Sequence, residues 1–168
     1  VVNSLDERQV IFVPDRNLAL YVARFSEKEI IPWEGYCIVH DRFTPADVRV
    51  ARDRYPGAEL IVHPECRPEV IDLADGVFST SGTIRRACTG GNREYIIGTE
   101  VGILHRLGKV CPEKRCHPLS EKAVCVNMKK TDLRKVHDAL VRMVPQVTVP
   151  EEVARRARKA IDRMLAVR

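Results

Sequence analysis

The sequence lacks any long apolar stretch. No run of apolar residues approaches the roughly 18 that a membrane-spanning helix requires, and the first eight residues do not combine a basic region with an apolar one, as a signal peptide would. We therefore expect a protein without a membrane partner that resides in the cytoplasm.

Aromatic residues are also scarce, with four Phe, four Tyr and one Trp in 168 residues. The net charge of +5 would suit nucleic acid, but the basic side chains concentrate towards the C-terminus and alternate with acids elsewhere. Neither a basic groove nor a set of aromatic stacking platforms is evident. We expect no nucleic-acid partner, and the positive excess fits a solvated helix or the binding of anionic metabolites.

Six cysteines are present without a secretion signal. This combination favours reduced thiols, metal ligands or small buried side chains over a framework of disulfides. Cys66 and Cys88 are interpreted as core or loop thiols.

Short apolar runs alternate with helical patterns, which indicates an α/β fold with parallel strands. The hydrophobic content of 45% is enough for a sizeable core. Residues 109–120 are rich in Pro, Lys and Cys and are expected to form a loop. Strands are predicted at 10–13, 29–31, 58–62, 76–78 and 94–100, and helices at 44–54, 68–74, 83–88, 101–107, 131–143 and 151–167.

One β-turn-α pattern occurs twice. Asp15 and Glu100 align as acidic turn residues between a strand and a helix, and a cysteine follows each, at Cys37 after 22 positions and at Cys125 after 25. Such repetition predicts that Cys37 and Cys125 lie on one side of the molecule and face a shared cavity. Cys111 and Cys116 are expected outside that cavity.

Two readings of the cysteines remain open. In the first reading Cys37, on a glycine-containing turn three residues before His40, and Cys125 are ligands of a soft metal. Two thiolates alone are too few for a structural zinc site or an iron–sulfur cluster, so this reading requires at least one further ligand. A small zinc-binding interaction module is the alternative, although its Cys-x4-Cys-His spacing departs from the common zinc patterns. The ligands of that module would be Cys111, Cys116, His117 and Cys125.

Polar side chains also follow the predicted strands. His63 and Glu65 flank the rigid Pro64 at the end of the strand 58–62, where a pair of this kind can perform acid-base chemistry or simply bond to neighbouring backbone. Thr80 and Ser81 precede a predicted helix, so their hydroxyls could bind a carboxylate or cap the helix.

Taken together, these motifs resemble those of quinolinate synthase in order and spacing, over nearly the whole chain. The segments that carry the resemblance are Phe12–Leu18, Gly35–His40, His63–Glu65, Ser79–Ser81, Gly98–Gly102 and Cys125–Lys129. The family implies three pseudo-symmetric α/β/α domains around one 4Fe-4S cluster, with one cysteine from each domain. Cys37 and Cys125 match the second and third of these ligands, and the first would lie before Val1.

The resemblance also implies a domain plan and a reaction. Residues 1–41 would end the second domain, 42–129 would form the third and 130–168 the closing helices, so that the N-terminal domain is missing and the fragment alone is expected to be inactive. The enzyme would condense iminosuccinate with dihydroxyacetone phosphate to quinolinate in NAD biosynthesis, with Glu65 and His63 as catalytic residues. The residues implied to contact the substrates are His63, Pro64, Glu65, Thr80, Ser81 and, near the triose phosphate, His40.

Overall fold

The computed structural model describes residues 1–167, which form two compact parts. The larger part is Gln9–Cys125, and the second part joins Val1–Arg8 to the residues after Cys125. The second part is helical, with α6 and α7 at or near the predicted positions. Its elements are the 3-10 helices η1 (Val2–Ser4) and η3 (Met128–Lys130) and the helices α6 (Leu133–Arg142) and α7 (Glu151–Ala166). Across residues 1–167 no helix combines the length and the apolar character needed to cross a membrane.

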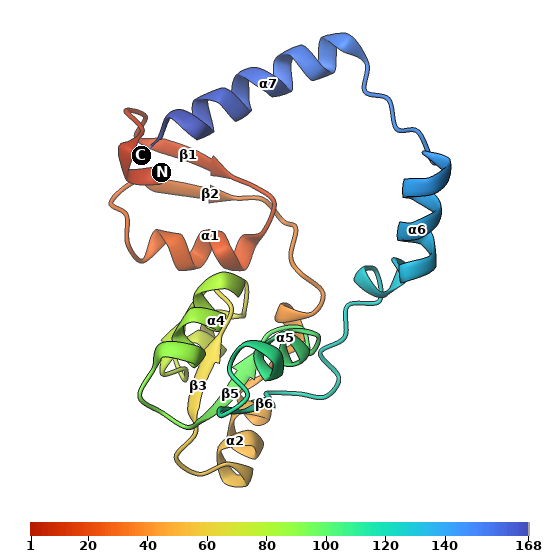
Figure 1. Ribbon diagram of the computed structural model, residues 1–168. Coiled ribbons are helices and arrows are strands. Elements are labelled where there is room, and N and C mark those ends of the chain that lie inside the picture. Colours follow the sequence, from red (N-terminus) through yellow and green to blue (C-terminus); the bar gives the residue numbers. More distant parts are fainter. Residues whose placement is uncertain (168) are drawn as a thin grey trace. The chain divides into compact units, whose positions relative to one another are not determined.

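The larger part contains two sheets, and every strand pair in them is parallel. Strands β1 (Gln9–Phe12) and β2 (Glu29–Pro32) form the smaller sheet, beside the helix α1 (Arg16–Ala23). The larger sheet has the strand order β4-β3-β5-β6, and Figure 1 labels β3, β5 and β6. These strands are β3 (Glu59–Val62), β4 (Gly76–Val77), β5 (Glu94–Gly98) and β6 (Arg115–Pro118), connected by α3 (Pro68–Ile71), α4 (Thr80–Thr89) and α5 (Ile103–Val110).

The larger sheet is covered on both faces, because successive side chains of a strand point to opposite sides. Leu60, Val62 and Ile96 pack with residues of α3 and of α2 (Pro45–Arg54), on what we call the α2 face. Ile61, Tyr95 and Ile97 pack with residues of α4 and α5, on what we call the α4 face. The α/β class is confirmed, and the larger sheet with its helices forms three layers.

Local capping determines where two helices begin. Thr44 and Asp47 form a reciprocal capping box at α2, with Pro45 in the first turn, so the helix predicted at 44–54 is confirmed. The start predicted for α4 at Thr83 is wrong by one turn. The hydroxyl oxygen of Ser79 accepts a hydrogen bond from the Gly82 amide at 3.3 Å, and α4 therefore begins at Thr80.

The segment 109–120 is not entirely a loop, because Arg115–Pro118 forms strand β6 at the edge of the larger sheet. This strand pairs with β5, for example through Cys116 opposite Tyr95. Its residues show no apolar alternation, which hid it from a reading of periodicity. An edge strand tolerates polar residues and a proline because one of its sides has no partner strand.

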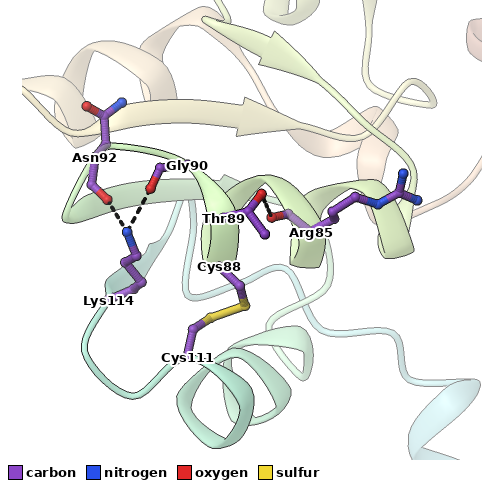
Figure 2. Close-up of a disulfide and its surroundings, with 7 residues drawn as sticks. All are labelled: Arg85, Cys88, Thr89, Gly90, Asn92, Cys111 and Lys114. Atoms are coloured by element: carbon purple, nitrogen blue, oxygen red, sulfur yellow. Dashed lines mark hydrogen bonds between the residues drawn. A yellow bond between two sulfur atoms is a disulfide. The ribbon is translucent and has the colours of Figure 1, made fainter.

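One pair of cysteines is oxidised, which corrects the interpretation of Cys88 as a core or loop thiol. Figure 2 shows the disulfide between Cys88, in α4, and Cys111, at the end of α5. Their Cα atoms are 5.3 Å apart, within the range that a disulfide spans. Close by, the ammonium of Lys114 donates to the carbonyl oxygens of Gly90 and Asn92, each at 2.8 Å. The disulfide and this lysine join α4 to the loop that precedes β6.

The smaller sheet is covered less completely than the larger one. Ile11 and Ile31 are register partners on one of its faces, and their exposed fractions are 73% and 42%. The two sheets lie on either side of residues 41 and 42 in the sequence. The domain boundaries at 41 and 129 stay predictions.

Candidate active site

The strand order of the larger sheet puts its topological switch point between β3 and β5. The chain leaves β3 through α3 on the α2 face and leaves β5 through α5 on the α4 face. In parallel sheets, ligands bind outside the carboxyl ends of the strands where the connections diverge in this way. Here those ends carry His63 to Glu65 after β3, and Thr99 with Glu100 after β5.

His40 joins the two strand ends from a third segment, the 3-10 helix η2 (His40–Arg42) that follows Cys37. Its Nδ1 is 3.0 Å from Glu65 Oε2, and its Nε2 is 2.8 Å from Thr99 Oγ1. The ring also stacks on that of His63, with centroids 4.3 Å apart. His40 is therefore buried with both ring nitrogens bonded to protein, and its contact with a triose phosphate stays a prediction.

The charges of this group favour an ionised thiol and an imidazolium. The hydrogen bond from His40 holds the pKa of Cys37 below its ordinary value. Burial alone would lower the pKa of His40, but the hydrogen bonds to Cys37 and Glu65 raise it to about 9. The same contact with His40 lowers the pKa of Glu65. Near neutral pH we expect an imidazolium and a carboxylate, beside a thiol that ionises more readily than an ordinary cysteine.

His63 has the opposite character. Burial, helped by the positive charge of His40, lowers its pKa, so the ring is neutral near pH 7. Its Nδ1 accepts the backbone N–H of Glu65 at 3.3 Å, which places the ring proton on Nε2. His63 thus offers a hydrogen-bond donor at Nε2, while its Nδ1 lies 3.7 Å from Glu65 Oε2, and the rigid Pro64 separates the two residues in the chain.

The two acidic turn residues accept equivalent pairs of backbone hydrogen bonds in the two copies of the repeat. Asp15 accepts the amide of Cys37 through Oδ2 and the amide of Leu18, in the first turn of α1, through Oδ1, both at 2.7 Å. Glu100 accepts the amide of Cys125 through Oε1 at 3.3 Å and the amide of Gly102, before α5, through Oε2 at 2.7 Å. These hydrogen bonds confirm the predicted alignment of Asp15 with Glu100.

Further contacts connect the Cys37 loop to the Glu65 loop. A Cβ at Gly35 would collide with the carbonyl oxygen of Pro14, so this turn needs glycine to lie against the end of β1. The amide of the buried Asn17 donates to Asp41 Oδ1 at 2.8 Å and to the Glu65 carbonyl oxygen at 3.2 Å. The sequence indicates only that Asn17 lies at the entry of a helix. Its contact with Glu65, 48 residues away, is not predictable because neighbouring residues carry no pattern for it.

The four cysteines singled out from the sequence fall on two faces of the larger sheet. Cys37 and Cys125 are free and half-buried, and both pack against the α2 face. Cys111 and Cys116 belong to the α4 face. The prediction that the first two lie on one side, apart from the other two, is confirmed. The cavity that they would share stays a prediction.

The same arrangement overturns the zinc-module alternative. Cys111 is bonded to Cys88, and Cys125 packs against the opposite face. Cys116 and His117 are successive residues of β6 and point to opposite sides, since the His117 ring stacks on Tyr55 at 3.7 Å, on the α2 face. These four residues therefore cannot surround one ion.

A different group of potential metal ligands lies beyond the carboxyl ends of β3 and β5. Among residues 1–167, the ligand atoms of Cys37, His40 and Glu65 all lie within 4.8 Å of one another. Thr80 and Ser81 occupy the exposed first turn of α4. Because Ser79 provides the cap of this helix, Thr80 and Ser81 are not its capping residues. Their role as substrate ligands stays a prediction.

Comparison with known proteins agrees with the resemblance noted above. A family model described as "Quinolinate synthetase A protein" matches residues 1–166. The quinolinate synthase of Methanoregula boonei is 67% identical over 99% of this chain and 55% of its own length. Quinolinate synthase 1 of Methanosarcina acetivorans is 52% identical over 100% of the chain and 55% of its own. For the quinolinate synthase of Desulforudis audaxviator the identity is 48%, over 99% of the chain and 55% of its own.

The chain thus spans about half the length of the curated relatives that it matches. The family match nevertheless extends from the first residue to residue 166. It includes both acidic turns, both cysteines of the repeat and the group around His40. The chain belongs to the quinolinate synthetase A protein family.

Proposed function

We propose that this chain supplies two of the three cysteine ligands and the iminosuccinate-binding residues of a quinolinate synthase. The enzyme would condense iminosuccinate with dihydroxyacetone phosphate to form quinolinate for NAD biosynthesis. One observation carries this proposal. The cysteines of the two repeat units, Cys37 and Cys125, pack against one face of the sheet, each with its amide held by an acidic turn residue.

The residues present fit a 4Fe-4S cluster. Its iron atoms take thiolate ligands, and the lowered pKa of Cys37 favours the thiolate, while Cys125 is free and half-buried on the same face. The third thiolate would come from the portion of the relatives that lies outside this chain, and the 168 residues alone are expected to be inactive. When bound, a cluster held by three thiolates supplies one iron that acts as a Lewis acid on a substrate oxygen.

The other side chains near the ends of β3 and β5 and at the start of α4 would serve as proton acceptor, substrate ligands and orienting residue. Glu65 is ionised, and His63, whose Nδ1 accepts the Glu65 amide, carries its donor on Nε2, so Glu65 would accept a proton from the substrate while the Nε2–H of His63 would bind a substrate oxygen. The hydroxyl of Thr80 and the first-turn amides of α4 suit a substrate carboxylate, with Ser81 next to them. His40 orients Glu65 through its Nδ1.

The decisive experiment replaces the proposed base. It uses the chain extended to the length of its relatives, called the full-length protein below. Glu65→Gln keeps the shape of the side chain but abolishes its basicity, and removing a general base costs about 10²- to 10⁴-fold in rate. We expect quinolinate formation to fall by this factor while the iron content stays at the wild-type level.

Glu69→Gln is the matched control, because this exposed glutamate lies four residues further on and pairs only at the surface, with Arg67. We expect its turnover to be unchanged. Turnover near the wild-type rate in cluster-loaded Glu65→Gln protein would transfer the proton-accepting role to His63.

The cytoplasmic location of the protein stays a prediction.

A further inference from the structure

We propose that Asp15 and Glu100 are paired positioning residues that hold the two cluster-binding cysteines through their backbone amides. This inference rests on the proposed function, since it concerns how Cys37 and Cys125 are presented to a cluster. It assigns a task to two acidic side chains that contact neither a substrate nor a sulfur atom in the argument above.

Asp15 is buried, with an exposed fraction of 4%, and both of its oxygens are engaged. Oδ1 caps α1 through the amide of Leu18, and Oδ2 accepts the amide of Cys37. One carboxylate therefore ties the start of a helix to a loop 22 residues later in the sequence. Neither contact can be released without leaving a buried charge or a buried amide poorly paired.

Glu100 repeats the device in the second unit, at 9% exposure. Its two oxygens accept the amides of Gly102 and Cys125. The interval between the acid and the cysteine is 25 residues for Glu100 and 22 for Asp15, so the acid with the longer side chain occurs in the unit with the longer interval. Two different acids in equivalent turns thus converge on the same target, a cysteine amide.

Helix capping alone does not explain these acids. Ser79 caps α4 with one hydroxyl oxygen at an exposed position, and Ser, Thr, Asn and Asp are similarly good caps. Burial of a carboxylate is costly unless both oxygens are bonded. In the first unit capping uses only Oδ1 of Asp15, so its second oxygen is needed only for the amide of Cys37. In the second unit Glu100 is not the cap of α5, yet it also accepts the cysteine amide.

Activation of the thiols does not explain them either. A negative charge close to a thiol disfavours its ionisation, and in the first unit the thiolate of Cys37 is favoured by His40 instead. What the carboxylates provide is a restricted backbone at the cysteine, so that less loop freedom is lost when the sulfur binds. Groups that orient metal ligands in this manner typically contribute 10- to 100-fold to metal affinity.

The test uses Asp15→Asn and Glu100→Gln in the full-length protein. Whichever way the new amide group is turned, its NH₂ faces one of the two backbone N–H groups, so one contact is lost. After anaerobic reconstitution we expect each variant to lose its cluster to a chelator about 10- to 100-fold faster than the wild type, measured as iron and sulfide per chain over time.

Asp15→Ser is a second variant that retains the cap of α1 but is too short to reach Cys37 as well, and it should behave like Asp15→Asn. Asp75→Asn is the matched control. Asp75 also accepts a backbone amide, that of Leu60 at 2.7 Å, but at the amino end of β3. We expect it to keep its cluster as long as the wild type.

The proposal is overturned if Asp15→Asn and Glu100→Gln retain the cluster like the wild type, or if Asp75→Asn loses it as fast as they do. A second measurement needs no cluster. In the apo protein, amide hydrogen exchange of Cys37 should accelerate at least tenfold in Asp15→Ser and not in Asp75→Asn, and unchanged exchange would also overturn the proposal. Failure of the wild-type protein to take up a cluster would instead remove the proposed function, and the exchange experiment would still decide the role of Asp15.

Discussion

The two β-turn-α units differ in support but agree in the way they present a cysteine. In the first unit, β1 belongs to a two-stranded sheet on which Ile11 and Ile31 are exposed. In the second, β5 lies between β3 and β6 and is covered on both faces. Yet Asp15 and Glu100 make the same pair of contacts. The two units therefore differ in how far their sheets are covered but share the hydrogen bonds between the turn carboxylate and the cysteine loop.

If the two units are equivalent in function, their cysteines should be equally indispensable. Cys37→Ala and Cys125→Ala in the full-length protein are each expected to lose the cluster completely, because one thiolate from this chain cannot replace two. Iron and sulfide analysis after anaerobic reconstitution measures this. Cys66→Ala is the control, since Cys66 is buried on the same face with its pKa raised to about 12 by burial. Retention of the cluster by either variant would break the equivalence.

The difference in support predicts unequal costs in the core. Ile97→Ala, at a residue of β5 that is 1% exposed, should lower the free energy of unfolding by about 2–5 kcal/mol. Ile11→Ala, at 73% exposure, should change it by no more than about 0.5 kcal/mol. Urea unfolding of the 168-residue chain compares the two variants directly. Similar costs would mean that the exposed face of the smaller sheet is covered in solution.

A smaller effect concerns the reactivity of the first cysteine. Because His40 lowers the pKa of Cys37, the thiolate persists as the pH falls below the ordinary range of a thiol. The pH profile for alkylation of Cys37 in the apo protein should therefore have its midpoint below that of an ordinary thiol. His40→Asn should shift the midpoint to higher pH and slow the reaction at pH 7, because the hydrogen bond that favours the thiolate is lost and an unperturbed thiol is only about a few per cent ionised there.

Cys116 is the internal reference for this experiment. It is also half-buried, but burial raises its pKa, so its alkylation should remain slow in both proteins. Mass spectrometry of the alkylated peptides separates the two sites. An unchanged pH profile of Cys37 in His40→Asn would show that another group favours its thiolate.

Local patterns were enough to predict much of the fold. The apolar run at β3 and the Thr44, Pro45 and Asp47 signal of α2 specify their elements through burial and capping, which are properties of a few neighbouring residues. The alignment of Asp15 with Glu100 predicted the repeat for the same reason, since each acid lies in the turn between a strand and a helix. Edge strand β6 escaped because its pairing with β5 does not depend on apolar side chains.

The site itself depends on distant contacts that a single sequence does not display. Glu65 and Thr99 lie 25 and 59 positions from His40, so the central role of His40 appears only once β3 and β5 are adjacent. The pairing of Cys88 with Cys111 likewise depends on how α4 and α5 pack, because only that packing brings their Cα atoms within bonding range. The cysteines of the repeat were predictable as a pair because their environments, unlike those of His40, are repeated in the sequence.

The larger sheet also separates two oxidation states of sulfur. Thiol–disulfide exchange requires a thiolate to reach a disulfide sulfur, but Cys37 packs on the α2 face and the Cys88–Cys111 bond lies on the α4 face. Within residues 1–167 the free thiol that shares the face of the disulfide is Cys116, which burial keeps protonated. The packed sheet therefore lies between the free thiol of Cys37 and the disulfide, so we expect exchange between them to be slow.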